Sequence, residues 1–198
     1  MKLTLPLLSP PEHLQALQAL QAQFAQACNV LAPQVAQSRV WNRVALHHLH
    51  YRSLRDQFPA LGSQMVCNAV YAMARTARQV YQNPASPFAA TLKSAAPLPP
   101  IVFMPTSPVY FDRHTLSWRQ SHLSLFTLQG RMVWESAQAA AMWPKFARMR
   151  SREIVLMGTP EQGYALTFDL VDVHDAQIQS PPQSADWMPE HVSLELSQ

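Results

Sequence analysis

The sequence predicts an α+β protein in which a helical region precedes a small antiparallel β-barrel or sandwich. Three observations lead to this fold class. Helical periodicity extends over residues 12–83, a Pro-, Ala- and Ser-rich linker follows at 84–100, and the apolar period changes from about 3.6 to about 2 after Ile101. With 198 residues, 48% of them hydrophobic, the chain can bury a core without disulfide or metal support.

The N-terminal part begins with a short strand and continues as helices. KLTLPLL within residues 1–11 alternates as a half-buried strand does, and SPPEH supplies a helix start with proline near the first turn. Apolar residues at helical spacing predict one helix from about Glu12 to Leu31, a second over Pro33 to His47 and a third over Ser63 to Tyr81. We therefore assign residues 12–83 to a helical domain.

The region 101–175 contains six or seven short apolar or alternating runs separated by turn-like residues. In GYALTFDLVDV, alternate residues are apolar, so one face of that strand is expected to be buried. Strands at such close spacing predict a barrel or a sandwich rather than a parallel sheet with crossover helices. Residues 176–198 are polar, acidic and interrupted by prolines, and we expect a loose tail there.

Several function classes lack their sequence signatures. With only four glycines, the sequence contains no P-loop, no GxGxxG fingerprint and no GxSxG elbow. Cys28 and Cys67 belong to no CxxC pair and are expected to be reduced core residues. The N-terminus lacks the apolar core of a secretion signal, and no stretch is long and apolar enough for a membrane span. We expect a soluble cytoplasmic protein that is not an enzyme.

Two clusters invite a metal or catalytic interpretation. Three histidines, His47, His48 and His50, have no nearby cysteine and lack the spacing of an HExxH helix. Three aspartates, Asp169, Asp172 and Asp175, are spaced by three on a predicted strand, so they alternate between its faces and do not converge. We expect no catalytic residue, no metal site and no cofactor.

Positive charge is concentrated in the middle of the chain. Between Arg39 and Arg152, fourteen Lys or Arg residues accompany three acids, whereas the chain after Gly158 has seven acids and no Lys or Arg. A basic body of this size favours a polyanion partner, most often nucleic acid, because each neutralised phosphate releases counterions. A solvated basic face without a partner is the alternative.

Arginine suits phosphate binding through its planar fork, and neighbouring aromatic rings can stack on unpaired bases. In the helical domain, the predicted nucleic-acid contacts are Arg39, Arg43, Tyr51, Arg52, Arg55, Arg75 and Arg78. In the strand-rich region they are Arg119, Arg131, Lys145, Arg148, Arg150 and Arg152. The tryptophans of that region, Trp118, Trp134 and Trp143, are expected in the core or in an interface.

Six motifs follow one another in the order found in a known family. They are KLTL at 2–5, FAQACN at 24–29, LHHLHYRSLRDQFPALG at 46–62, SQMVCNAVYAMARTARQVYQ at 63–82, FDRHTLSW at 111–118 and HLSLFTLQGR at 122–131. Together they resemble the N-terminal half of the TnpB proteins, transposon-associated RNA-guided nucleases related to type V CRISPR effectors. Each motif alone is weak, but the set spans residues 2–173 in the right order.

The resemblance implies a wedge-type β-barrel, built from the first strand and the region after Ile101, with a helical recognition domain inserted. In the family, these parts bind the guide RNA scaffold and the guide–target duplex and help to read a short DNA motif. The RuvC-type acidic motifs and the zinc ribbon of the family have no counterpart here. The resemblance therefore implies a nuclease-less RNA-binding subunit.

Such a subunit would be the non-catalytic half of a split RNA-guided system, with a separate RuvC-type nuclease as partner and RNA or duplex DNA as ligand. Two alternatives stay open. The chain is a protein-interaction adaptor of a defence or transposition complex, or it is a decayed transposon remnant.

Overall fold

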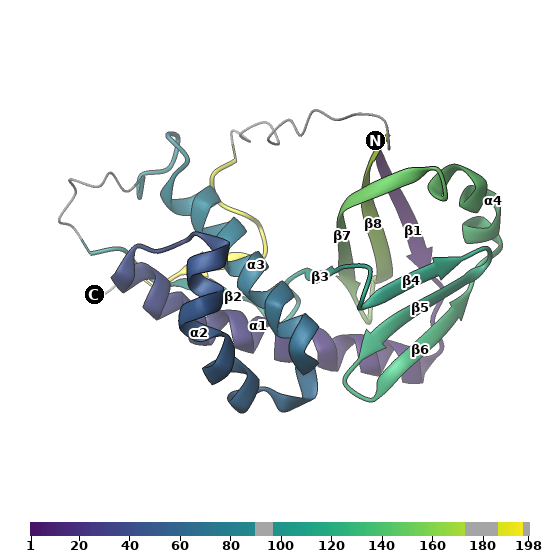
Figure 1. Ribbon diagram of the computed structural model, residues 1–198, viewed down its shortest axis with the longest axis horizontal. Helices are drawn as coiled ribbons and strands as arrows, with labels where there is room; N and C mark the ends of the chain where they lie inside the picture. Colours follow the sequence, from purple (N-terminus) through teal and green to yellow (C-terminus); the bar gives the residue numbers. More distant parts are fainter. Residues whose placement is uncertain (90–96, 173–185, 196–198) are drawn as a thin grey trace. The chain divides into compact units, whose positions relative to one another are not determined.

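A computed structural model describes residues 1–89, 97–172 and 186–195 (Figure 1). In this part of the chain the protein is α+β, with four α-helices and antiparallel sheets, which confirms the predicted class. Two compact units are present: a sheet unit of Met1–Gln21 and Pro108–Ser180, and a helical unit of Ala22–Ser107 and Pro181–Gln198. The strands of the described residues form three separate sheets and no closed barrel.

Four strands of the sheet unit form one antiparallel sheet, in the order β1 (Lys2–Leu7), β8 (Gly163–Asp172), β7 (Met149–Thr159) and β3 (Val109–Phe111). Alternate residues of β1 and β8 are buried, as the period of two predicted. Because the first strand pairs with β8, the helical segment is inserted between strands of one sheet (Figure 1).

A second sheet of this unit has the order β4 (Leu116–Arg119), β5 (His122–Thr127) and β6 (Gly130–Glu135), and helix α4 (Ala137–Phe146) follows it. Aromatic side chains join the two sheets. The ring of Trp118 on β4 lies 5.2 Å from that of Phe168 on β8 and 4.1 Å from that of Phe146 at the end of α4. This aromatic cluster is the centre of the unit's core. Trp118 and Trp134 are buried, as expected for core tryptophans.

A buried polar contact attaches the first part of helix α1 (Pro11–Ser38) to the sheet unit. The hydroxyl of Tyr164 donates to Oε1 of Gln21 at 2.9 Å, and Nε2 of Gln21 donates to the carbonyl of Gly158 at 3.2 Å. Gly158 has φ +124°, and a Cβ there would collide with the backbone of Gly163. Burial, with a smaller effect from the charge of Glu161, raises the pKa of Tyr164 to about 12.

Stability at alkaline pH tests this contact. Tyr164 is neutral in the fold, and its pKa exceeds the ordinary value of about 10, so its contribution to stability is complete below pH ~10 and is lost as pH rises through about 12. Tyr164→Phe should lower the free energy of unfolding by about 1–2 kcal/mol at neutral pH, because Oε1 of Gln21 loses its donor. Between neutral and alkaline pH, the free energy of unfolding of Tyr164→Phe should then decrease less than that of the natural protein.

Urea unfolding at neutral and alkaline pH measures both effects. Tyr51→Phe in the helical unit is the matched control. Tyr81 contributes a residual alkaline loss in all variants, because burial also raises its pKa. Equal alkaline losses in Tyr164→Phe and the natural protein would contradict the assignment.

The helical unit contains the rest of α1, followed by α2 (Arg43–Gln57), the short 3-10 helix η1 (Pro59–Leu61) and α3 (Gly62–Tyr81). The predicted helix break before Pro33 is wrong, since α1 continues through this proline to Ser38. Leu31 and Val35 are both buried, and this continuous packing outweighs the proline's cost of about 3 kcal/mol. The break falls instead at Arg39, whose φ is +56°.

Helix α2 begins at Arg43, directly after the N-capping residue Asn42. Oδ1 of Asn42 accepts hydrogen bonds from the backbone N–H groups of Val44 and Ala45, at 3.0 and 3.1 Å. Such a cap satisfies donors that have no partner within the helix. The third predicted helix is confirmed as α3, which is buried on more than one face between Met65 and Tyr81.

The C-terminal region contributes a strand to the helical unit. Strand β2 (Ile101–Phe103) pairs antiparallel with β9 (Val192–Leu194), so the structure differs from the predicted loose tail at 176–198 and from the assignment of all of 101–175 to the strand-rich region. A three-residue strand is too short for a periodic signal. Residues 176–185 and 196–198 of the predicted tail lie outside the described residues, as do 90–96 of the predicted linker. The linker's end is attached to α3, since the Tyr81 hydroxyl donates to the Pro99 carbonyl at 2.6 Å.

One side chain of α1 completes the hydrogen bonding of β2. Oδ1 of Asn29 accepts from the backbone N–H of Phe103 at 2.7 Å, and its Nδ2 donates to the carbonyl of the same residue at 3.0 Å. The amide thus takes the place of a neighbouring strand along this edge. An edge satisfied in this way is protected from pairing with another chain.

Replacing Asn29 with alanine should therefore lower the free energy of unfolding by about 1–3 kcal/mol, because two backbone groups of Phe103 lose their partner. Chemical denaturation measures the change. Gln26→Ala, at an exposed position of the same helix, is the control and should change stability by less than about 0.5 kcal/mol. Equal effects of the two substitutions would show that the amide does not stabilise the edge.

Candidate nucleic-acid interface

The structure divides the predicted contact residues between the two units. The helical unit contains Arg39, Arg43, Tyr51, Arg52, Arg55, Arg75 and Arg78, and the sheet unit contains Arg119, Arg131, Lys145, Arg148, Arg150 and Arg152. All of them belong to the described residues. Each unit is considered by itself.

The densest group in the sheet unit comprises Lys145, Arg148, Arg150 and Arg152, and we call it the α4–β7 cluster. Lys145 lies near the end of α4, Arg148 follows in the connecting turn, and the other two lie in β7. All four side chains are exposed, whereas Phe146, Met149 and Ser151 between them are half-buried. The stretch therefore projects its cations outward, while the side chains of Phe146, Met149 and Ser151 turn toward the protein.

The register of β7 explains this alternation. Ser151 is paired with Leu170, which is fully buried, and Arg150 is paired with Val171 on the opposite face of the sheet. A β-bulge between Ser151 and Glu153 then inserts Arg152 as an additional residue. A bulge re-aims a side chain and increases the local twist of a strand. Two arginines separated by one residue thus project from the beginning of β7.

Aromatic packing fixes the base of the α4–β7 cluster. Phe146 lies next to Lys145, and its ring is 4.1 Å from that of Trp118 and 5.4 Å from that of Phe168. The ring of Trp143, one turn earlier, is 6.1 Å from Trp118. The end of α4 is thereby held on the core, and charged groups on a rigid base can contact a ligand without a large ordering cost.

Arg131 is largely engaged within its own sheet. Its Nε donates to Oγ of Ser124 at 3.1 Å, its Nη1 to the carbonyl of His114 at 3.1 Å, and its Nη2 to the Ser124 carbonyl at 2.9 Å and to Oγ of Ser117 at 3.3 Å. Four of the five guanidinium N–H groups are used by these contacts. Its principal role in the structure is to connect β4, β5 and β6. Arg119, at the end of β4, is exposed.

In the helical unit, a cation and an aromatic ring meet between α2 and α3. Cζ of Arg43 lies 5.3 Å from the ring centroid of Tyr71, a cation–π distance. Arg75 follows Tyr71 by one helical turn, and Arg78 follows three residues later. We call Arg43, Tyr71, Arg75 and Arg78 the α2–α3 cluster. Sequence reasoning did not name Tyr71, although its spacing of four from Arg75 was a usable signal.

The other predicted residues of this unit are in varied surroundings. The ring of Tyr51 stacks on that of His47, with centroids 4.6 Å apart, so one of its faces is covered. Nη1 of Arg55 donates to the carbonyl of Pro59 at 3.3 Å. Arg52 is exposed on α2. Arg39 occupies the turn between α1 and α2.

No group of three His, Cys, Asp or Glu side chains within the described ranges is arranged to hold a metal ion. Of the three aspartates, Asp169 is paired with Lys2 across β1 and β8, and Asp175 lies outside the described residues. Cys28 is a core residue, as expected. Its Sγ donates to the Ala69 carbonyl at 3.7 Å, and burial raises the pKa of its thiol.

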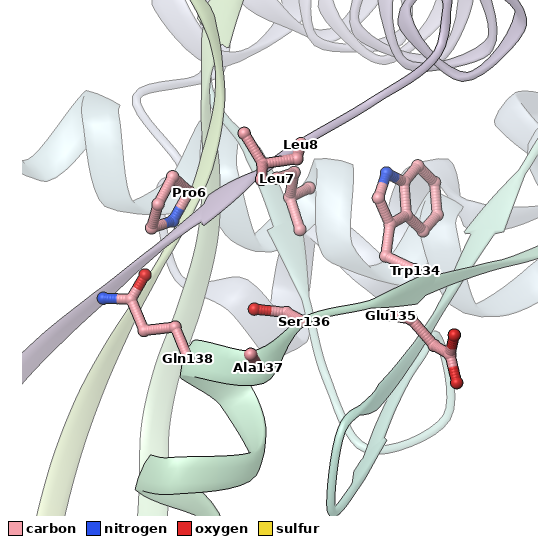
Figure 2. A pocket seen from close by; sticks show the side chains of 8 residues that line it. All are labelled: Pro6, Leu7, Leu8, Trp134, Glu135, Ser136, Ala137 and Gln138. Atoms are coloured by element: carbon pink, nitrogen blue, oxygen red, sulfur yellow. The ribbon is translucent and has the colours of Figure 1, made fainter.

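The sheet unit also contains a cavity of about 220 Å³ (Figure 2). Figure 2 shows the end of β1 opposite the first residues of α4, and the lining residues are Pro6, Leu7, Leu8, Trp134, Glu135, Ser136, Ala137 and Gln138. Nε1 of Trp134 donates to Oγ of Ser9 at 2.7 Å, and the Ser136 hydroxyl caps α4. The cavity lies at the opposite end of α4 from Lys145, so it does not belong to the α4–β7 cluster.

Comparisons with known proteins supply no family. The sequence matches no protein-family model, and a search of curated proteins gave no match. None of the helices within the described residues combines the length and the apolar character needed to cross a membrane. The geometry and charge of the clusters are therefore the basis for a functional proposal.

Proposed function

We propose that this chain is an RNA-binding subunit without nuclease activity. The observation that carries the proposal is the α4–β7 cluster, in which four exposed cations occur within eight residues above an aromatic base. Three of the four are arginines, which suit bidentate phosphate contact. The α2–α3 cluster adds an arginine over an aromatic ring, the combination used to hold unpaired bases and their phosphates.

The resemblance to TnpB narrows the ligand to a guide RNA scaffold or an RNA–DNA duplex. The pairing of β1 with β8 around an inserted helical segment supports a wedge-and-recognition arrangement of this kind. In such a system base pairing reads the sequence, while the protein positions phosphates. The chain then acts as the non-catalytic half of a split effector in the cytoplasm, and a separate RuvC-type subunit supplies cleavage.

Purification of the protein from its host, followed by sequencing of the co-purified nucleic acid, tests this proposal. A dominant small RNA is the expected result. Its release should increase steeply with salt concentration, because phosphate contacts release counterions. Random fragments without a dominant RNA would exclude the guided version.

A protein-interaction adaptor is the second candidate. The observation that favours it is apolar exposure on α2, where the side chains of Val44 and Leu49 are 63% and 62% exposed. An apolar interface responds weakly to salt, unlike phosphate binding. A partner that stays bound at high salt, with no RNA retained, would support the adaptor. A neighbouring gene for a RuvC-type half would argue against a decayed remnant.

A further inference from the structure

The C-terminal strand segment brings negative charge to the helical unit. Residues 186–195 include three exposed carboxylates, Asp186, Glu190 and Glu195, and no Lys or Arg. This segment lies along α3, the helix that supplies Tyr71, Arg75 and Arg78 to the α2–α3 cluster. The basic α2–α3 cluster, which we propose binds phosphates, thus has acidic residues beside it.

Several contacts hold residues 186–195 in place. Nε2 of Gln79 on α3 donates to the backbone carbonyl of Asp186 at 2.9 Å, and the ring of Trp187 lies 5.8 Å from that of Phe88. The carbonyl of His191 accepts from the backbone N–H of Met104 at 3.1 Å and from Oγ of Ser107 at 3.0 Å. With the β2–β9 pairing, these contacts make the segment a fixed part of the unit.

Two observations place the segment near Arg75. Gln79, which holds Asp186, follows Arg75 by one helical turn. His191 lies close enough to Arg75 for their charges to interact: burial lowers the pKa of His191, and the positive charge of Arg75 lowers it further. Glu190 is the neighbour of His191 in the chain. Charges within a Debye length of about 8–10 Å act on one another at moderate salt.

We propose that residues 186–195 form a fixed acidic border that repels phosphates from the Arg75 side of the α2–α3 cluster. The border weakens unspecific binding of polyanions and directs an RNA toward Arg43 and Tyr71. It acts by repulsion and is not displaced by the ligand, because its backbone is hydrogen-bonded to α3 and to β2. This inference rests on the proposed RNA-binding function.

Neutralising the border tests the inference. The variant D186N/E190Q/E195Q is compared with E12Q/E135Q/E161Q, which makes the same change of net charge at exposed positions of the sheet unit. The probe is a labelled oligouridine of about 20 nucleotides at low salt. The border variant should bind roughly three- to tenfold more tightly than the natural protein, since negative charge beside the cluster, above all that of Glu190 and Glu195, is removed. The matched variant should change affinity by less than about twofold.

Thermal unfolding of each variant shows whether the fold is kept. The variant E190Q/E195Q, which leaves Asp186 intact, should also bind the probe more tightly than the natural protein, but with a smaller gain than the triple variant. If the natural protein binds the probe and the border variant binds it no more tightly, the proposed acidic border would be overturned, whereas the RNA-binding proposal would not. An equal gain in the matched variant would also overturn it, because net charge alone would then explain the effect. If neither the natural protein nor any variant binds the probe, both proposals would be overturned.

Discussion

Replacing Lys145, Arg148 and Arg150 together with glutamine should weaken RNA binding by on the order of 100-fold at ~0.1 M salt. Each phosphate contact with a single strand releases about 0.7 of a counterion, so three lost contacts should reduce the slope of log K against log salt by about 2. All three side chains are exposed, and their removal leaves the aromatic packing of Phe146 in place. Arg152 is kept, because a change at the bulge could also alter β7.

The control for this prediction is K2Q/R113Q, which removes exposed cations of the same unit outside the predicted contact set. It should retain most of the affinity and nearly the natural salt slope. Filter binding over a salt series measures both quantities. A triple variant with natural affinity and slope would show that the α4–β7 cluster does not bind phosphates.

Phe168→Ala is expected to have the largest effect on stability, with a loss of about 3–5 kcal/mol in the free energy of unfolding. Phe168 is fully buried on β8, and its ring contacts those of Trp118 and Phe146. Removing it leaves a cavity between the two sheets, because the surrounding rings cannot collapse fully into the space. Denaturant unfolding measures the loss.

Phe126→Ala is the matched substitution on the outer side of the same unit, where the phenyl ring is half-buried and paired across the strands with Arg131. It should cost about 1 kcal/mol. The contrast separates core packing from the general effect of removing a phenyl ring. Similar losses for both variants would contradict the description of the aromatic cluster as the centre of the core.

Strand β8 and helix α3 could be predicted from the sequence because their signals are local. The alternation of Tyr164, Leu166, Phe168 and Leu170 specifies one buried face whatever the strand pairs with, and all four are buried. The α1 boundary could not be predicted, because Pro33 is a local signal for a break and the packing that overrides it is not local. Strand β9 was missed for a related reason, since its partner β2 lies about 90 residues away.

In the candidate site, too, some features could be predicted from the sequence and others could not. Lys145, Arg148, Arg150 and Arg152 are consecutive enough in the sequence to be recognised as one basic stretch, and the structure places all four at the surface. Arg131 looked equivalent, but its guanidinium connects three strands that only the fold brings together. Arg43 and Tyr71 meet because α2 and α3 pack side by side.

The sequence by itself determined the α+β class, the periodicity of the strands and helices, and the concentration of positive charge between Arg39 and Arg152. These are properties of composition and of neighbours along the chain. Only the tertiary structure decided which cations are exposed, which are engaged in hydrogen bonds, and that an acidic C-terminal segment lies beside α3. Such relations depend on contacts between residues far apart in the chain, and pairwise contacts of this kind leave no periodic trace in one sequence.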